Sequence, residues 1–249
     1  MDFVNGQPCW VDVMVKDAGT QKALTNFLTE LFGLRWEIGG PETGFYAMAF
    51  AGDGAVMAVG RHEQGAGQLV TYLHCEDIAA TAEAITKAGG QVFMGPMQVM
   101  DAGTMGMAMD PAGAVVGLWQ GNLMKGFGAF DVPGAFTWFD LMSTDPVRAA
   151  AFYGGVFGLD ASGADEMMPG YMLGTAPNFV ASVSQTDPGM PSFWNPIFTV
   201  ANLDETEAKA TALHCQVVMS HMKVPGGAAS AIMNPALGLT LVFFQAMEG

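Results

Sequence analysis

The feature that most constrains the fold of this 249-residue chain is an internal repeat. The segment "FLTELFGL", which begins at Phe27, is similar to "FYGGVFGL", which begins 125 residues later at Phe152. The same offset relates "GGQVFM" from Gly89 to "HCQVVM" from His214. A chain that repeats itself at one offset encodes the same structural elements twice, because each copy buries the same apolar pattern. The sequence therefore predicts two equivalent halves.

The opening strands of the two halves share an unusual pattern. "CWVDVMVKD" from Cys9 and "TWFDLMSTD" from Thr137 both carry a Trp, an Asp two residues later and a closing Asp. The join between the halves is rich in glycine and contains a proline, as linkers commonly are. We place the first domain at residues 1–122, the linker at 123–130 and the second domain at 131–249.

Within each half, the order of predicted elements starts again once. A strand with alternating apolar residues is followed by apolar residues at helical spacing, and then by short apolar runs separated by turn residues. Helical spacing begins at Ala23 and Ile78, and in the second half it covers 146–157 and 203–213. The pattern predicts strand–helix–strand–strand–strand four times, which is an α+β fold of four βαβββ modules.

Composition and charge exclude several classes of partner. The net charge is −15 with nine Lys and Arg residues, so the chain has no basic patch for nucleic acid or an anionic membrane. No apolar run reaches the roughly 20 residues of a membrane span. The three cysteines are widely spaced, which favours reduced thiols in a cytoplasmic protein. The twenty methionines either fill the core or line a pliable pocket.

The four modules, together with "FYGGVFGL", "FLTELFGL" and "DPAGAVVGLWQ", resemble the vicinal oxygen chelate superfamily. That group contains glyoxalase I, extradiol dioxygenases and bleomycin-resistance proteins, and the pattern is most similar to its tandem, hydroxylase-like or glyoxalase-like branch. The resemblance covers nearly the whole chain. It implies two tandem domains with curled, cup-shaped sheets, but this scaffold supports many chemistries, so it does not by itself set the reaction.

The resemblance also implies where a metal would be bound. Metal-dependent members carry one ligand on the first strand and one on the last strand of a module, and these ligands are His or Glu. In this chain the corresponding places hold Trp10, Val70, Trp138, Asn195, Gly117 and Val242, with Met57 and Ser182 near a further position. An indole has no lone pair to offer a metal. We therefore expect no metal and no cofactor.

The same geometry predicts which side chains line the cups. Residues two apart on a strand share a face, so Trp10, Asp12 and Met14 point the same way. The two tryptophans of the opening strands either stack on a planar ligand or fill the space of the lost metal. An apolar cavity with a few polar groups suits a small apolar or aromatic molecule. The expected ligand-binding residues are Trp10, Met14, Tyr72, Trp119, Trp138, Met142, Asn195, Thr199 and Phe244.

Three polar residues of the cups are candidates for catalysis: Asp12, His74 and Asp140. A carboxylate on an apolar strand face is costly unless it is paired or its pKa rises, and a raised pKa suits a general acid or base. Asp12 could form an acid–base pair with His74 in the first cup. The alternative is that each Asp is a structural anchor that accepts hydrogen bonds from nearby groups.

Three classes of function follow from these residues. The first is a metal-independent protein that binds a small molecule, of the drug-sequestering or ligand-sensing kind. The second is a metal-free enzyme, hydroxylase-like, lyase or isomerase, that uses Asp12 and His74 for proton transfer. The third is an interaction protein that merely keeps the scaffold. In each case we expect a monomer or a weak homodimer.

Overall fold

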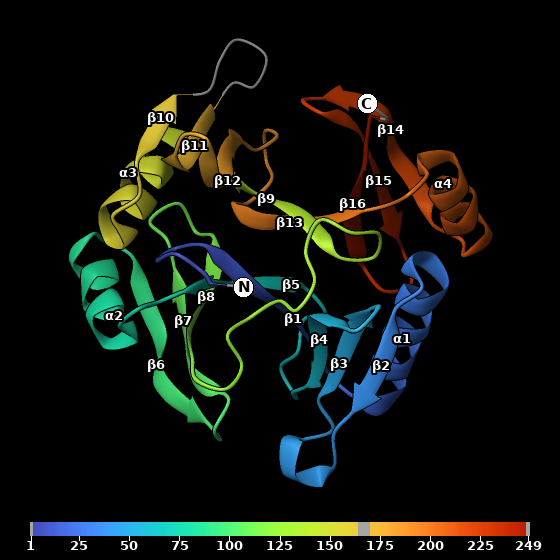
Figure 1. Ribbon diagram of the computed structural model, residues 1–249, viewed down its shortest axis with the longest axis horizontal. Coiled ribbons are helices and arrows are strands. Elements are labelled where there is room, and N and C mark those ends of the chain that lie inside the picture. Colours follow the sequence, from blue (N-terminus) through green and yellow to red (C-terminus); the bar gives the residue numbers. More distant parts are fainter. Residues whose placement is uncertain (1, 164–169, 248–249) are drawn as a thin grey trace. The chain divides into compact units, whose positions relative to one another are not determined.

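The computed structural model describes residues 2–163 and 170–247, and Figure 1 shows its elements. In the first half the order is β1 (Pro8–Val15), α1 (Ala18–Phe32), β2 (Arg35–Ile38), a 3-10 turn (Pro41–Thr43), β3 (Ala47–Ala51), β4 (Gly54–Arg61), β5 (Leu69–His74), α2 (Ile78–Lys87), β6 (Gln91–Val99), β7 (Gly103–Met109) and β8 (Val115–Gly121).

The second half repeats this order. It consists of β9 (Phe136–Ser143), α3 (Pro146–Phe157), β10 (Ala161–Gly163), β11 (Gly170–Thr175), β12 (Asn178–Gln185), β13 (Phe193–Thr199), α4 (Leu203–Ala212), β14 (Gln216–Val224), β15 (Gly227–Asn234) and β16 (Leu239–Ala246). Each half forms one eight-stranded mixed sheet, in the orders β2-β3-β4-β1-β5-β8-β7-β6 and β10-β11-β12-β9-β13-β16-β15-β14. The predicted α+β fold of four βαβββ modules is confirmed.

The sequence did not locate one strand in each half. Strand β2 has four residues, of which Arg35, Glu37 and Ile38 are exposed, and it pairs only with β3. Strand β10 is exposed along all three of its residues. Such short edge strands carry no alternation of apolar and polar residues, so periodicity gives no signal for them.

The repeat extends to the contacts that start the helices. The Asp17 carboxylate accepts a hydrogen bond from the Thr20 backbone N–H at 2.8 Å, as is typical of an N-cap. The side-chain oxygen of Gln120 accepts the backbone N–H of Ile78 at 3.0 Å, and Gln245 accepts that of Leu203 at 2.8 Å. In each half, therefore, a glutamine of the last strand accepts a hydrogen bond from the first residue of the second helix.

The structure divides into two compact units, each of which takes segments from both halves. Unit 1 consists of Met1–Trp10, Val70–Gly126 and Phe139–Asn195, and unit 2 of Val11–Leu69, Phe127–Trp138 and Pro196–Gly249. The division at 1–122, 123–130 and 131–249 stays a prediction about the repeat.

The core of unit 2 is an aromatic cluster. Phe198 is fully buried, and its ring centroid lies 4.3 Å from that of Phe32 on α1 and 4.3 Å from that of Phe136 on β9. Phe243 of β16 meets Phe32 edge-on at 6.3 Å. These rings come from all three segments of unit 2, so the cluster joins them.

The core of unit 1 contains a buried aromatic pair within its segment Phe139–Asn195. The buried ring of Tyr153 on α3 meets Trp194 of β13 at 5.3 Å, and its hydroxyl accepts the Trp194 indole N–H at 3.0 Å. In the same unit α2 lies along β6 and β7 (Figure 1). Among the described residues, no helix is long and apolar enough to cross a membrane.

Candidate functional site

One face of unit 1 brings together aromatic and methionine side chains from four neighbouring strands. The register pairs His74 of β5 with Trp119 of β8, Trp119 with Met105 of β7, and Met105 with Met97 of β6. In the adjacent row the register pairs Tyr72, Gly117, Met107 and Met94 in the same order, and a register shift on β6 places Met94 three residues from Met97. Paired residues of a ladder point to the same face. We call these eight residues the methionine–aromatic face.

The opposite side of these strands is the core of unit 1. Leu73, Leu118 and Ala108, which alternate with the residues of the face, are each about 1% exposed. A Cβ added at Gly106 would lie 3.6 Å from the Ile78 side chain of α2, so this side packs on the helix. The methionine–aromatic face is therefore the side of the sheet that α2 does not cover.

Tyr72 and Gly117 fit together within the face. Tyr72 is 4% exposed, and a Cβ added at Gly117 would collide with the Tyr72 ring. The Tyr72 ring fills the space that the missing side chain of Gly117 leaves. Glycine is required here because the ring lies directly over its backbone.

Trp119 is held from two sides. Its indole N–H donates to the Met124 carbonyl at 2.9 Å, and a Cβ at Gly103 would lie 2.7 Å from its ring. The methionines beside it are more accessible. Met105 and Met107 are half-buried, while Met94 is 39% and Met97 48% exposed. Solvent therefore reaches the face from the β6 side.

His74 places one free polar atom at the end of the face. Its backbone pairs with Gly6 and Gln7, and its ring centroid lies 6.2 Å from that of Phe3. Its Nδ1 is buried and has no hydrogen-bond partner among the described residues. Burial, aided by Lys125 and opposed by Glu76, lowers the pKa of His74, so the imidazole is neutral at pH 7.

The equivalent face of the second half, in unit 2, is simpler. Its rows are Thr199, Phe244, Ala229 and Met222, and Ile197, Val242, Ala231 and Met219. Alanines replace two methionines, and Val242 replaces Gly117 where Ile197 replaces Tyr72. The Thr199 hydroxyl is buried without a hydrogen-bond partner among the described residues, like Nδ1 of His74. The first half thus has the more polarisable face.

The two predicted carboxylates accept hydrogen bonds from hydroxyl groups. Asp140 accepts from Ser182 at 2.9 Å and from Ser184 at 3.0 Å, whereas Asp12 accepts from the Tyr46 hydroxyl. The register explains the difference, because Ser182 lies opposite Asp140 while Ala58 lies opposite Asp12. The residue of the first half that is equivalent to Ser182 is therefore Ala58, and not the neighbouring Met57 that the sequence suggested. The catalytic roles of Asp12, His74 and Asp140 stay predictions.

The hydrogen bond from Tyr46 to Asp12 was not predicted from the sequence. The loop before β3 is anchored by Gln21, whose amide donates to the carbonyls of Phe45 at 2.9 Å and Val59 at 2.7 Å. The Gln21 carbonyl oxygen accepts from Nε of Arg61 at 2.7 Å. The network fixes the backbone next to Tyr46, so the phenol is directed onto a strand 34 residues away in sequence.

The remaining predicted ligand-binding residues lie in different settings. Trp10 is 4% exposed in unit 1, and Met14 in unit 2 would lie 2.5 Å from a Cβ added at Gly60. The side chains of Trp138, Met142 and Asn195 are half-buried.

Asp140 gives a prediction for pH dependence. Burial, opposed by the Ser182 and Ser184 hydroxyls, raises the pKa of Asp140 above 3.8, so the folded state binds its proton at a higher pH than the unfolded state. The contribution of this group to stability is therefore complete below pH 3.8 and is lost as the pH rises through the folded pKa. Asp140→Asn, which keeps an acceptor oxygen, should gain stability over wild type at pH 7, and the gain should shrink towards pH 4.

Urea unfolding of both proteins at the two pH values measures this difference. Other titrating groups are common to the two proteins and largely cancel. An equal gap at pH 7 and pH 4 would show that the carboxyl does not titrate differently on folding.

The residues at the family's metal positions do not fit a metal ion. Trp10 and Gly117 offer no side-chain ligand, and neither do Val70 and Val242. No group of three or more His, Cys, Asp or Glu side chains that could hold a metal occurs in residues 2–163 and 170–247.

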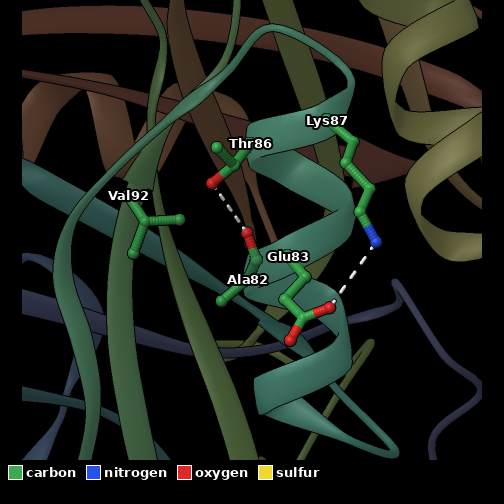
Figure 2. A pocket seen from close by; sticks show the side chains of 5 residues that line it. All are labelled: Ala82, Glu83, Thr86, Lys87 and Val92. Carbon is green, nitrogen blue, oxygen red and sulfur yellow. Dashed lines mark hydrogen bonds and ion pairs between the residues drawn. The ribbon is translucent and has the colours of Figure 1, made fainter.

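Two surface hollows lie away from the methionine–aromatic face. An open hollow of about 410 Å³ lies between α2 and β6. Its lining side chains are shown in Figure 2. Lys87 pairs with Glu83 at 3.5 Å, and Thr86 donates to the Ala82 carbonyl at 3.0 Å. In unit 2 a hollow of about 170 Å³ lies where the end of α1 meets the start of α4. In the first hollow the polar side chains bind local partners, which gives it no group directed at a ligand.

The chain has curated relatives over nearly its whole length. It is 32% identical over 250 residues to "Putative glyoxylase CFP32" of Mycobacterium bovis, which covers 95% of this chain and 94% of that protein. It is 29% identical over 257 residues to the anthracycline biosynthesis protein DnrV of Streptomyces peucetius, which covers 94% of this chain and 91% of that protein. No protein-family model matches the chain.

Solved structures share the fold. A Mn(II)-bound glyoxalase from Novosphingobium aromaticivorans superposes with a TM-score of 0.69 at 16% identity, over 98% of this chain and 83% of that one. The 2,2',3-trihydroxybiphenyl 1,2-dioxygenase of Sphingomonas wittichii also reaches 0.69, at 13% identity over 97% and 91%. The sequence relatives and these folds agree, and the chain belongs to the vicinal oxygen chelate superfamily of glyoxalases and extradiol dioxygenases.

Proposed function

We propose that the chain binds a planar apolar or aromatic small molecule on the methionine–aromatic face of unit 1, without the metal used by other members of its superfamily. The observation that carries the proposal is the grouping of Tyr72 and Trp119 with half-exposed methionines beside a neutral imidazole that has a free nitrogen. Ligand sites combine a mostly apolar lining with a few placed polar groups.

The chemistry of the face suits a flat ring. Methionine sulfur is polarisable and makes favourable contacts with aromatic rings, worth about 0.3–1.5 kcal/mol each. The four methionines also adapt their shape because each has three rotatable bonds. Nδ1 of His74 would supply one directional hydrogen bond, since a buried polar atom without a partner costs about 1–3 kcal/mol.

The name of one relative supports a particular class of small-molecule ligand. The Streptomyces protein is named for anthracycline biosynthesis, and anthracyclines carry a fused, planar aromatic ring system. This supports a fused-ring aromatic compound as the ligand. Independence from a metal is supported by the side chains at the family's ligand positions, where the first strands carry Trp10 and Trp138.

A binding measurement tests the proposal. We expect 1,4-dihydroxyanthraquinone to quench tryptophan fluorescence with saturation and to raise the Tm, because a ligand at 100 times its Kd stabilises the folded state by about 2.7 kcal/mol. His74→Ala and Trp119→Phe should each weaken binding roughly tenfold, which corresponds to about 1.4 kcal/mol.

The second half supplies a matched control. Thr199→Ala and Phe244→Leu alter the equivalent positions of the other face and should leave the affinity unchanged. If those two variants weaken binding while His74→Ala does not, the ligand binds elsewhere. Absence of both quenching and a Tm shift with dihydroxyanthraquinone, catechol and naphthalene derivatives would contradict the proposal.

A metal-free enzyme is the second candidate function. In unit 1 the neutral imidazole of His74 can accept a proton, and in unit 2 the buried carboxylate of Asp12 with Tyr46 offers a separate acid–base group. The "glyoxylase" relative points to the glutathione hemithioacetal of methylglyoxal as a first substrate to assay. Turnover that survives chelation and is lost in both His74→Ala and Asp12→Asn would favour this candidate over binding alone.

Metal content can be measured directly. After dialysis against a chelator and re-exposure to Fe(II), Mn(II), Ni(II) and Zn(II), the protein should hold far less than one of these ions per chain. The reason is that the family positions lack carboxylate and imidazole ligands. Elemental analysis by mass spectrometry gives the ratio, and one tightly held ion per half would refute metal independence.

A further inference from the structure

The β6–β7 hairpin of unit 1 carries methionines that face one another across its two strands. Six methionines fall between Met94 and Met109. The register pairs Met94 with Met107 and Met97 with Met105 across the two strands. We call these four residues the methionine ladder. Both pairs lie on the face that α2 does not cover, and Met94 and Met97 are partly open to solvent.

The geometry of the hairpin favours convergence of the four sulfur atoms. Directly paired residues of an antiparallel ladder have Cβ atoms about 4.5–5.5 Å apart. The register shifts between Met94 and Met97, so this bulged strand presents its two methionines opposite residues that are only two apart on β7. Each methionine side chain has three rotatable bonds, which lets thioethers from adjacent rungs meet at one point.

The donor type selects the ligand. Thioethers are neutral, soft donors that suit Cu(I), whereas Mg²⁺, Ca²⁺ and Mn²⁺ prefer oxygen. A monovalent cation on neutral ligands is also favoured by a protein whose net charge is −15. We propose that the methionine ladder binds one Cu(I) ion through the sulfur atoms of Met94, Met97, Met105 and Met107.

The second half lacks this arrangement at the same positions. Met219 and Met222 of β14 lie opposite Ala231 and Ala229 of β15, so each rung has one sulfur atom and one methyl group. Two thioethers on one strand, three residues apart, offer half of the donors. The two hairpins of the chain therefore form an internal comparison, and only the first should hold the ion. The ladder methionines are also four of the eight residues of the methionine–aromatic face, but binding of Cu(I) needs only their sulfur atoms and not Tyr72, Trp119 or His74.

Titration with Cu(I) and Ag(I) tests the proposal in the full chain. Under anaerobic conditions with ascorbate, Cu(I) is supplied as its complex with bicinchoninate, and the loss of the complex's absorbance measures the copper taken by the protein. We expect one ion per chain. With methionine labelled at the 13C methyl group, Ag(I) should shift the NMR signals of the four ladder residues, which single Met→Leu variants assign.

Matched variants show whether the ladder methionines, rather than other sulfur atoms of the chain, bind the Cu(I) ion. Replacing all four ladder methionines with Leu conserves volume and should keep the far-UV circular dichroism spectrum and the Tm within a few degrees. It should lower Cu(I) affinity at least tenfold. Met219→Leu with Met222→Leu should leave the affinity unchanged.

The thiols provide the remaining comparison. Burial raises the pKa of Cys9 and raises that of Cys75 to about 12, so both are protonated and poor metal ligands at pH 7. Substituting Ser for Cys9, Cys75 and Cys215 should therefore leave the ladder's methyl shifts in place. Unchanged copper uptake in the folded four-Leu variant, or methyl shifts confined to other methionines, would overturn the proposal.

Discussion

Replacing Phe198 with alanine is expected to lower the free energy of unfolding by about 3–5 kcal/mol, the range for removing a large buried aromatic ring. Phe198 is fully buried and packs against Phe32 and Phe136, which lie 166 and 62 residues before it in the chain. The cavity would lie where the three segments of unit 2 meet. The effect should therefore reach the whole unit rather than one strand.

Urea unfolding followed by circular dichroism and by tryptophan fluorescence measures this loss. Phe93→Ala is the control, because Phe93 is 52% exposed and its truncation should stay within about 0.5 kcal/mol. If Phe198→Ala costs no more than Phe93→Ala, the aromatic cluster does not hold unit 2 together. Fluorescence and circular dichroism transitions that no longer coincide would show that the two units unfold separately.

Placing a methyl group at Gly117 should alter the candidate site and cost about 1–3 kcal/mol of stability, because the added Cβ overlaps the Tyr72 ring. In Gly117→Ala the ring has to leave its position across from β8. Binding of dihydroxyanthraquinone should weaken together with stability, since the Tyr72 ring would be displaced within the methionine–aromatic face. The measurement is the free energy of unfolding and the Kd of the same variant.

A double-mutant cycle isolates this steric contact. Tyr72→Ala removes the ring, so Gly117→Ala should cost much less in that background, and the interaction energy should fall within about 0.5–3 kcal/mol. The second half supports the reasoning, because Val242 replaces this glycine where the paired residue is Ile197. Equal costs of Gly117→Ala with and without Tyr72 would mean that the loss comes from backbone entropy rather than from the ring.

The sequence predicted much of the architecture because the responsible signals are local. The 125-residue offset, the helical spacing and the capping residues each depend on neighbours a few positions apart. The helix predicted at 146–157 matches α3 at both ends, where Pro146 starts it and Gly158 has a φ of 70° just beyond it. Alternation along a strand likewise predicts which residues share a face.

The partners of the site residues were beyond the reach of the sequence. The phenol of Tyr46 reaches Asp12 because Gln21 fixes the intervening loop, and periodicity does not report such a contact. The sequence shows that methionines are numerous, but it does not show that those of β6 pair with those of β7. A bulge changes the register between the two strands, and periodicity does not report it.

The amino-acid sequence by itself determined the duplicated α+β fold and its superfamily. Those conclusions depend on residue identity and on periods of two or 3.6 residues, which are properties of short segments. Only the tertiary structure decided that Tyr72 covers Gly117, that hydroxyl groups hold both buried carboxylates, and that thioethers gather on one hairpin. Register, bulges and long-range packing set those contacts, and they arise only when strands distant in sequence pair.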